Sequence, residues 1–143
     1  MKLFYCTGLF FPARIANRTT IMKTCEALRR AGVDITLFAS SLSESESEVF
    51  AFYGVRDAFP IRMLQNMEQG CFKSWFYARM YKRILETEKP DIVYLREPKL
   101  AFCMCLLMGK KLNFVYEIHN EGPDFISKIL HRYLLPRATG VVC

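Results

Sequence analysis

The stretch that decides the fold runs from residue 91 to residue 122 and reads DIVYLREPKLAFCMCLLMGKKLNFVYEIHNEG. Residues 91–95 and 114–118 are short apolar runs typical of buried strands, and residues 100–109 between them predict a buried helix. Two neighbouring strands that are joined through a helix run parallel to each other, because the crossover returns the chain to the same starting edge of the sheet. This stretch therefore predicts a parallel sheet.

The same alternation extends in both directions along the chain. Thr19 or Thr20 can cap a helix that Gly32 ends, and Pro90 closes a later helix. The prediction is an α/β fold in one domain, residues 1–143, with a doubly wound, mainly parallel Rossmann-like sheet and helices on both faces. The other strands are expected at 2–7, 33–39, 60–64 and 140–143, and the other helices at 19–31, 46–53, 72–88 and 123–135.

Length and composition fit a soluble globular domain. The chain has 143 residues, enough for one domain with a real core but tight for two. Hydrophobic residues make up 52% and charged residues 24%, which argues against disorder. The net charge of +6 suits an anionic partner, such as a phosphorylated ligand, an acidic membrane surface or a nucleic acid, without choosing among them.

The cysteines and the N-terminus favour the cytoplasm. The six cysteines include no C-x-x-C pair, which is typical of reduced, buried thiols. The longest apolar run, residues 100–108, is about half of the roughly 20 residues that a membrane span needs. The N-terminus is similar to a signal peptide, but Thr7 and Gly8 break its apolar run, and the following sequence needs this segment as a strand.

Ligands of doubly wound sheets bind beyond the carboxyl ends of the strands, near the point where the strand order reverses. Three loops are expected to leave this edge, at residues 8–18, 96–98 and 119–124. The candidate binding residues that they gather are Asn17, Arg18, Arg96, Glu97, His119, Asn120, Glu121 and Asp124.

Glu117 and His119 flank Ile118 at the end of a predicted strand. A neutral histidine there could hydrogen-bond a ligand hydroxyl or a backbone carbonyl, and a purely structural histidine is the alternative. Glu117 is expected to face the interior and to form a structural ion pair with Arg96. The loop at 8–18 has neither G-x-G-x-x-G nor a P-loop, which disfavours a dinucleotide dehydrogenase. The N-terminus of the following helix still suits a phosphate.

The helix expected at 72–88 has two sides of different chemistry. Its core face is expected to carry Phe72, Trp75, Phe76, Met80 and Ile84, at three- and four-residue spacing. We interpret the other side as a solvated basic face, with peripheral membrane contact as an alternative, and expect no nucleic-acid partner. That side consists of Lys73, Tyr77 and Tyr81, with Arg79, Lys82 and Arg83 nearby.

Four segments in this order resemble the N-terminal domain of family 4 glycosyltransferases, which are retaining, nucleotide-sugar-dependent enzymes of the GT-B fold. They are residues 1–39 with their EALRRAGVDITLFA end, EKPDIVYLREP at 88–98, FVYEIHN at 114–120 and RATGVVC at 137–143. The resemblance covers essentially the whole chain. It implies transfer of a sugar from a nucleotide-sugar donor to an unknown acceptor, without a metal or other cofactor.

The resemblance also implies roles by position. His119 is expected to be catalytic, at the donor sugar, and Glu117 structural. The first loop departs from the family, because Ile15 and Ala16 replace a common glycine pair that lets the backbone approach a phosphate. The other assignments place Ala16, Asn17 and Arg18 at the donor phosphates and Arg96, Glu97 and Asn120 in the interdomain cleft.

The family's second Rossmann-like domain, which holds most of the nucleotide site, is not in this sequence, and the first is expected to be incomplete at its C-terminus. Three interpretations stay open. The chain is the acceptor-side domain of a cytoplasmic glycosyltransferase, inactive alone and sited at the inner face of a membrane, or one subunit of a split enzyme that a partner chain completes. The third is a non-catalytic module that binds a phosphorylated ligand or a protein.

Overall fold

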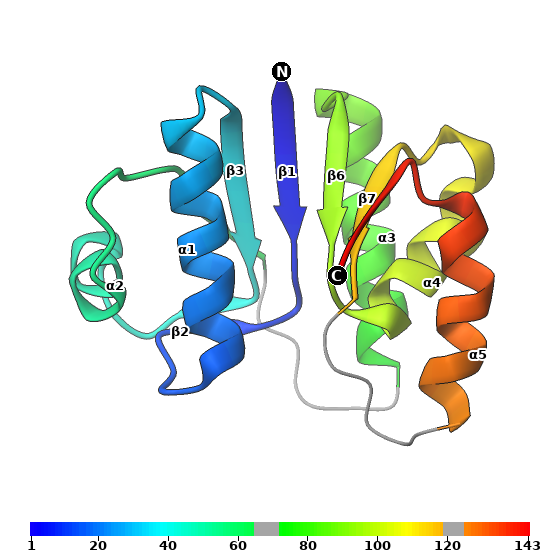
Figure 1. Ribbon diagram of the computed structural model, residues 1–143, viewed down its shortest axis with the longest axis horizontal. Helices are drawn as coiled ribbons and strands as arrows, with labels where there is room; N and C mark the ends of the chain where they lie inside the picture. Colours follow the sequence, from blue (N-terminus) through cyan, green and yellow to red (C-terminus); the bar gives the residue numbers. More distant parts are fainter. Residues whose placement is uncertain (65–71, 119–124) are drawn as a thin grey trace.

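A computed structural model describes residues 1–64, 72–118 and 125–143. Its centre is a six-stranded sheet in which every pair of neighbouring strands is parallel (Figure 1). The strand order is β5-β3-β1-β6-β7-β8, so the predicted doubly wound α/β class is confirmed. The strands are β1 (Lys2–Cys6), β3 (Asp34–Ala39), β5 (Ile61–Met63), β6 (Ile92–Leu95), β7 (Phe114–Glu117) and β8 (Gly140–Val142).

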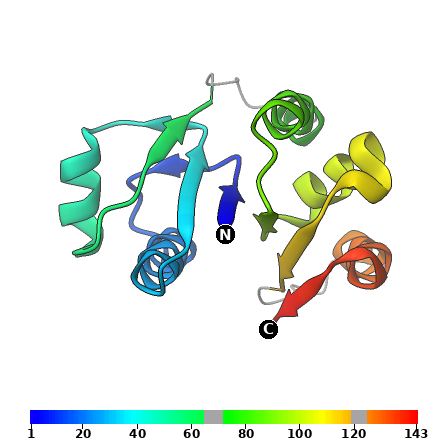
Figure 2. The same ribbon diagram turned by 90° about the horizontal axis from the view of Figure 1, so that it is seen from above.

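Helices cover both faces of this sheet. One face carries α1 (Ala16–Arg30) and α2 (Glu46–Tyr53). The other face carries α3 (Lys73–Glu88), α4 (Pro98–Met108) and α5 (Phe125–Leu134), and Figure 2 shows α1 and α3 on opposite sides of the strands. Short 3-10 turns follow α4 at Gly109–Lys111 and α5 at Leu135–Arg137.

The central strands are apolar on both faces because both faces are covered. Leu3 and Tyr5 of β1 point into the cluster under α1, whereas Phe4 and Cys6 point into the cluster under α3 and α4. All four side chains are at least 97% buried. This is the residue pattern that a central parallel strand requires.

The ends of the helices follow local chemistry. Ser45 caps α2 in a capping box with Glu48, and Gly32 leaves α1 with a φ of 82°, as predicted for the glycine. The expected threonine cap of α1 is wrong, because α1 begins at Ala16. Thr20 is a residue of the helix itself, and its hydroxyl donates to the backbone oxygen of Ala16 at 3.0 Å.

A second, two-stranded sheet was not expected from the sequence. It pairs β2 (Phe10–Phe11) with β4 (Ser41–Leu42) in parallel, just beyond the carboxyl ends of β1 and β3. Phe11 is fully buried in the cluster under α1. Part of the predicted loop at 8–18 is therefore anchored to the segment that follows β3.

The predicted core face of α3 is wrong. The buried side chains are Tyr77, Ala78, Tyr81 and Leu85, whereas Phe72 is 78% exposed. Trp75 and Phe76 are also exposed, and Met80 and Ile84 are only partly buried. Hydrophobicity misleads here because Tyr81 can be buried, since its hydroxyl bonds to the Thr7 backbone. Three large aromatic side chains therefore face outward at the N-terminal end of α3.

None of the helices within the described ranges is long and apolar enough to cross a membrane.

Candidate functional site at the carboxyl edge of the sheet

The strand order reverses between β1 and β6. From β1 the sheet grows through β3 to β5, and from β6 it grows through β7 to β8 on the other side (Figure 1). Loops that leave the carboxyl ends of such neighbouring strands diverge, which opens a crevice for ligands. Thr7 and Gly8 follow β1, and Arg96 and Glu97 follow β6, so these four residues form the centre of the candidate site.

Glu97 connects the two sides of the switch point. Its Oε1 atom accepts a hydrogen bond from the backbone amide of Gly8 at 2.9 Å and another from the hydroxyl of Thr7. Glu97 is also the residue before α4, and Pro98 occupies the first helical position, where a missing N–H costs nothing. The start of α4 is thereby fixed to the exit of β1.

Tyr81 of α3 fixes the backbone of the same exit. Its hydroxyl donates to the backbone oxygen of Thr7 at 2.7 Å and accepts from the Thr7 amide at 3.0 Å. Burial raises the pKa of the Tyr81 hydroxyl well above its ordinary value, so the group stays protonated. A Cβ atom on Gly8 would lie 3.1 Å from the Tyr77 ring, so a larger residue there would require this ring to shift.

Arg96 and Glu117 form a buried ion pair at the ends of β6 and β7. The Nη1 and Oε1 atoms are 3.1 Å apart, and the two side chains are 4% and 11% exposed. The pairing of Leu95 with Tyr116 places these two residues opposite each other, one position further along. The contact that the sequence suggested between them is therefore present.

Two tyrosines extend the ion pair into the core. The Tyr5 hydroxyl donates to Oε2 of Glu117 at 3.4 Å, and the Tyr5 ring stacks on Tyr94 with centroids 4.7 Å apart. Burial, together with the negative charge of Glu117, raises the pKa of both tyrosines. They therefore remain neutral donors beside the carboxylate.

Arg96 keeps unused donor capacity. Its Nε and Nη2 atoms are buried and have no hydrogen-bond partner among the described residues. A guanidinium offers five N–H donors, and leaving buried ones unsatisfied is costly. The arrangement is suited to an acceptor-rich anion, such as a carboxylate or a phosphate, at the end of β6.

Ala16, Asn17 and Arg18 lie in the first turn of α1 and not in the loop before it. Ala16 is exposed, and the Arg18 guanidinium lies over the Phe10 ring, 5.3 Å from its centroid. Asn17 Oδ1 and Arg18 Nε are buried without a hydrogen-bond partner in the part of the chain that the structure describes. No side chain caps this helix at Ile15, so its positive end can attract an anion.

A family model described as Glycosyltransferase Family 4 matches residues 18–143. The chain belongs to this glycosyltransferase family. A comparison with curated protein sequences finds no match.

Solved structures confirm the GT-B type of fold for this family 4 chain. A glycosyltransferase from Rickettsia africae ESF-5 is 13% identical with a TM-score of 0.53, covering 93% of this chain and 33% of that one. A candidate UDP-N-acetylglucosamine 2-epimerase from Listeria monocytogenes is 12% identical with a TM-score of 0.64, covering 98% and 37%. A further UDP-N-acetylglucosamine 2-epimerase is 11% identical with a TM-score of 0.56, covering 99% and 41%. This chain therefore spans about a third to two fifths of the proteins that it resembles.

The expected site of the family 4 chain is only partly described. Thr7, Gly8, Arg96, Glu97 and Glu117 come together at the switch point. No hydrogen bond or ion pair within the described ranges joins them to the first turn of α1. The other predicted residues, His119, Asn120, Glu121 and Asp124, lie outside the described residues, so their roles stay predictions.

Sequence reasoning missed Thr7, Gly8 and Tyr81 as parts of this site. A signal was present for the first two, because Thr7 and Gly8 interrupt an apolar strand at its carboxyl end. No signal marked Tyr81, whose role depends on which face of α3 is buried. Among the described residues, no group of three or more His, Cys, Asp or Glu side chains could hold a metal ion.

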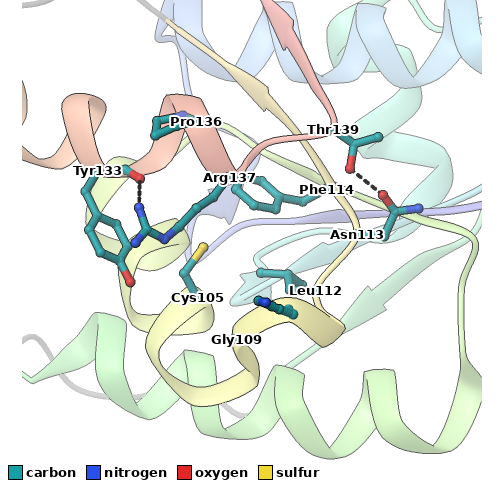
Figure 3. Close-up of a pocket in the computed structure, with 10 residues that line it drawn as sticks. Cys105, Gly109, Leu112, Asn113, Phe114, Tyr133, Pro136, Arg137 and Thr139 are labelled. Atoms are coloured by element: carbon teal, nitrogen blue, oxygen red, sulfur yellow. Dashed lines mark hydrogen bonds between the residues drawn. The ribbon is translucent and has the colours of Figure 1, made fainter.

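A separate pocket of about 900 Å³ lies at the opposite edge of the family 4 domain. It is bounded by the end of α4, the start of β7 and the end of α5. Figure 3 shows Arg137 donating to the backbone oxygen of Tyr133, at 2.7 Å, and Thr139 donating to Asn113, at 2.5 Å. Arg137, Thr139 and Asn113 already have partners, and the pocket lies far from the carboxyl edge, so we do not assign the reaction to it.

Proposed function

We propose that this chain is the acceptor-side domain of a retaining glycosyltransferase, which transfers a sugar from a nucleotide-sugar donor to an acceptor. The observation that carries the proposal is the buried Arg96 guanidinium at the end of β6, beside the switch point, whose Nε and Nη2 donors find no partner among the described residues. Family membership supports the reaction class.

Loss of a nucleoside diphosphate requires positive charge and oriented dipoles around the leaving phosphates. Arg96 and the uncapped N-terminus of α1, with Asn17 and Arg18, would supply them from this side of the cleft. In this proposal His119 contacts the donor sugar, Asn120 lines the cleft, and no metal is needed. Glu117 fixes the position of Arg96 and does not touch the substrate.

We further propose that a second, donor-binding domain or a separate partner chain completes the enzyme, so that residues 1–143 alone turn over slowly or not at all. The proposed location is the cytoplasm, at the inner face of a membrane, which the net charge of +6 favours. A partner of either kind would approach the carboxyl edge, because ligands of this fold bind there.

The test is release of nucleoside diphosphate from UDP-glucose, UDP-N-acetylglucosamine and GDP-mannose by the protein purified together with its native partners. We expect release with one donor, and a loss of about 100-fold or more in Arg96→Lys or His119→Ala. Arg29→Lys, an exposed residue of α1, is the matched control and should leave the rate unchanged.

Two outcomes contradict the proposal. The first is the absence of release with all three donors, in a preparation that still binds one of them, which would favour the non-catalytic module. The second is unchanged release in both Arg96→Lys and His119→Ala, which would remove both residues from the reaction.

A further inference from the structure

An apolar rim surrounds the N-terminal ends of α3 and α5. Phe72 and Phe125 are 78% and 73% exposed, and Trp75, Phe76, Ile126 and Ile129 are also exposed. Solvent exposure of six large apolar side chains at one place is unusual for a surface that faces only water. We name these six residues the apolar rim.

Two hollows border four of the six rim residues, Phe72, Trp75, Phe76 and Ile126. A groove of about 440 Å³ runs between α3, α4 and α5, and its floor includes Phe102, Cys103 and Leu130. A smaller hollow of about 330 Å³ lies along α3 between Trp75, Phe76 and Arg79. Apolar side chains therefore alternate with grooves that could accept acyl chains or other apolar groups.

The helix layer that carries the rim has an extreme charge. The helices α3, α4 and α5 with the short turns that follow two of them, residues 73–88, 98–111 and 125–137, contain half of the chain's 20 lysines and arginines and two of its 14 acidic residues. These two acidic residues, Glu86 and Glu88, lie at the C-terminal end of α3, away from the rim. Others, such as Glu44, Glu46 and Glu48, lie at α2, at the other end of the sheet. The basic residues of the layer are Lys73, Arg79, Lys82, Arg83, Lys99, Lys110, Lys111, Lys128, Arg132 and Arg137.

Three of these lysines lie at helix positions where a positive charge is electrostatically unfavourable. Lys73, Lys99 and Lys128 lie in the first turns of α3, α4 and α5, and none of these turns contains an acidic residue. Helix N-termini carry partial positive charge and are stabilised by Asp and Glu, not by Lys. An external anionic surface beside the three helix ends would offset this repulsion.

We propose that the apolar rim and these lysines dock the chain on an anionic lipid bilayer. Aromatic and aliphatic side chains enter the interface between headgroups and acyl chains, while lysines bind the anionic headgroups. Charge complementarity favours this occupant over a protein domain, because a layer with ten basic and only two acidic residues matches a uniformly anionic surface. This inference deepens the proposed membrane location by naming the residues that make the contact.

The position of the surface has a consequence for the substrate. Helices of a parallel α/β fold run against the strands, so the N-terminal ends of α3 and α5 lie at the same edge as the switch point (Figure 1). A docked chain therefore presents its crevice close to the bilayer. The acceptor is then a lipid-bound molecule, an inference that rests on the proposed function.

The test is co-sedimentation of the purified chain with vesicles of phosphatidylcholine alone or with 30% phosphatidylglycerol, in the absence of any nucleotide-sugar. We expect binding to the anionic vesicles that weakens steeply as salt rises. The double variants Phe72→Ser with Phe125→Ser, and Lys73→Glu with Lys128→Glu, should each weaken partitioning at least about tenfold.

Matched controls come from the other end of the sheet. Phe52→Ser removes an aromatic side chain on α2 that is 42% exposed, and Arg29→Glu reverses an exposed charge on α1. Neither should weaken binding by more than about twofold, and circular dichroism verifies the fold of every variant.

Three outcomes overturn the inference: no sedimentation with anionic vesicles, equal binding to neutral vesicles, or rim variants that bind like the wild-type chain. Because no sugar donor is present, these outcomes are independent of whether the chain takes part in sugar transfer. If the chain binds the vesicles but no nucleotide-sugar is turned over, the proposed function is rejected and the docking inference is not.

Discussion

The carboxylate of Glu97 accepts a hydrogen bond from the backbone amide of Gly8 at 2.9 Å, across the point where the strand order reverses. The same Oε1 atom accepts from the Thr7 hydroxyl. Substitution Glu97→Ala leaves both donors without this partner, and we expect it to lower the free energy of unfolding by about 1–3 kcal/mol.

Urea denaturation followed by circular dichroism measures this loss. Glu97→Gln keeps an oxygen acceptor at the same reach and is the control, so it should lose less than Glu97→Ala. Equal stability of the alanine variant and the wild-type chain would show that the contact does not hold the β1 exit.

Tyr77 and Tyr81 give a paired prediction about buried hydroxyls. The Tyr81 hydroxyl exchanges two hydrogen bonds with the Thr7 backbone, so Tyr81→Phe should cost about 1–3 kcal/mol. The Tyr77 hydroxyl is buried without a partner among the described residues, so Tyr77→Phe should be neutral or stabilising.

The two variants remove the same atom from the same helix, so each is the control for the other. Thermal melts at one pH suffice to rank them. A Tyr77→Phe variant that is less stable than Tyr81→Phe would contradict the hydrogen bonding described for α3.

The buried pair of Arg96 and Glu117 should behave as a unit. Glu117→Leu leaves the guanidinium buried without its counter-charge, and we expect a loss of about 3–5 kcal/mol. Arg96→Met combined with Glu117→Leu removes both charges, so the double variant should be more stable than Glu117→Leu alone.

Chemical denaturation of the two single variants and the double variant gives the coupling free energy. Additive losses would mean that the 3.1 Å contact contributes no interaction to the folded state.

Glu26 of α1 should make stability depend on acid pH. Its carboxylate accepts from the Arg56 amide at 2.6 Å and from Lys23 at 2.9 Å, and these hydrogen bonds lower its pKa to about 2 from an ordinary value of 4.5. A lowered pKa in the folded state adds stability that is present above pH 4.5 and is lost as the pH falls towards 2.

The measurement compares the wild-type chain with Glu26→Gln across this range. The advantage of the wild-type chain should be constant above about pH 5 and should shrink below pH 4.5. Glu44→Gln, an exposed residue before α2, is the matched control. An advantage that persists unchanged to pH 2.5 would contradict the contacts of Glu26.

The sequence predicted the sheet well because strands buried on both faces leave a continuous apolar signal. Residues 91–95 and 114–118 contain β6 and β7, and the helix expected between them contains most of α4. The pair β2 and β4 was missed because two-residue strands have no periodicity to detect. The start of α1 was placed three residues late, because the Thr cap that it assumed is not used.

The site was predictable where strand order alone determines it. Arg96 and Glu117 end neighbouring strands, so their contact follows from the register of β6 and β7. The partners of Glu97 did not follow, since they depend on how closely the β1 exit approaches the start of α4. The choice between the two faces of α3 depends on the Tyr81 hydroxyl finding the Thr7 backbone, which no local pattern encodes.

The reversed strand order also constrains how this chain folds. Pairs within each half of the sheet are near in sequence, such as Val93 with Phe114, whereas the seam between the halves pairs Leu3 with Ile92. Closing the longer loop between β1 and β6 costs more chain entropy. The contacts that form offset this cost only when both strands are already ordered. We therefore expect the two half-sheets to form first and the β1–β6 seam to close last. The crevice at the seam would then exist only in the finished molecule, and a partly folded chain would have no crevice to offer a ligand.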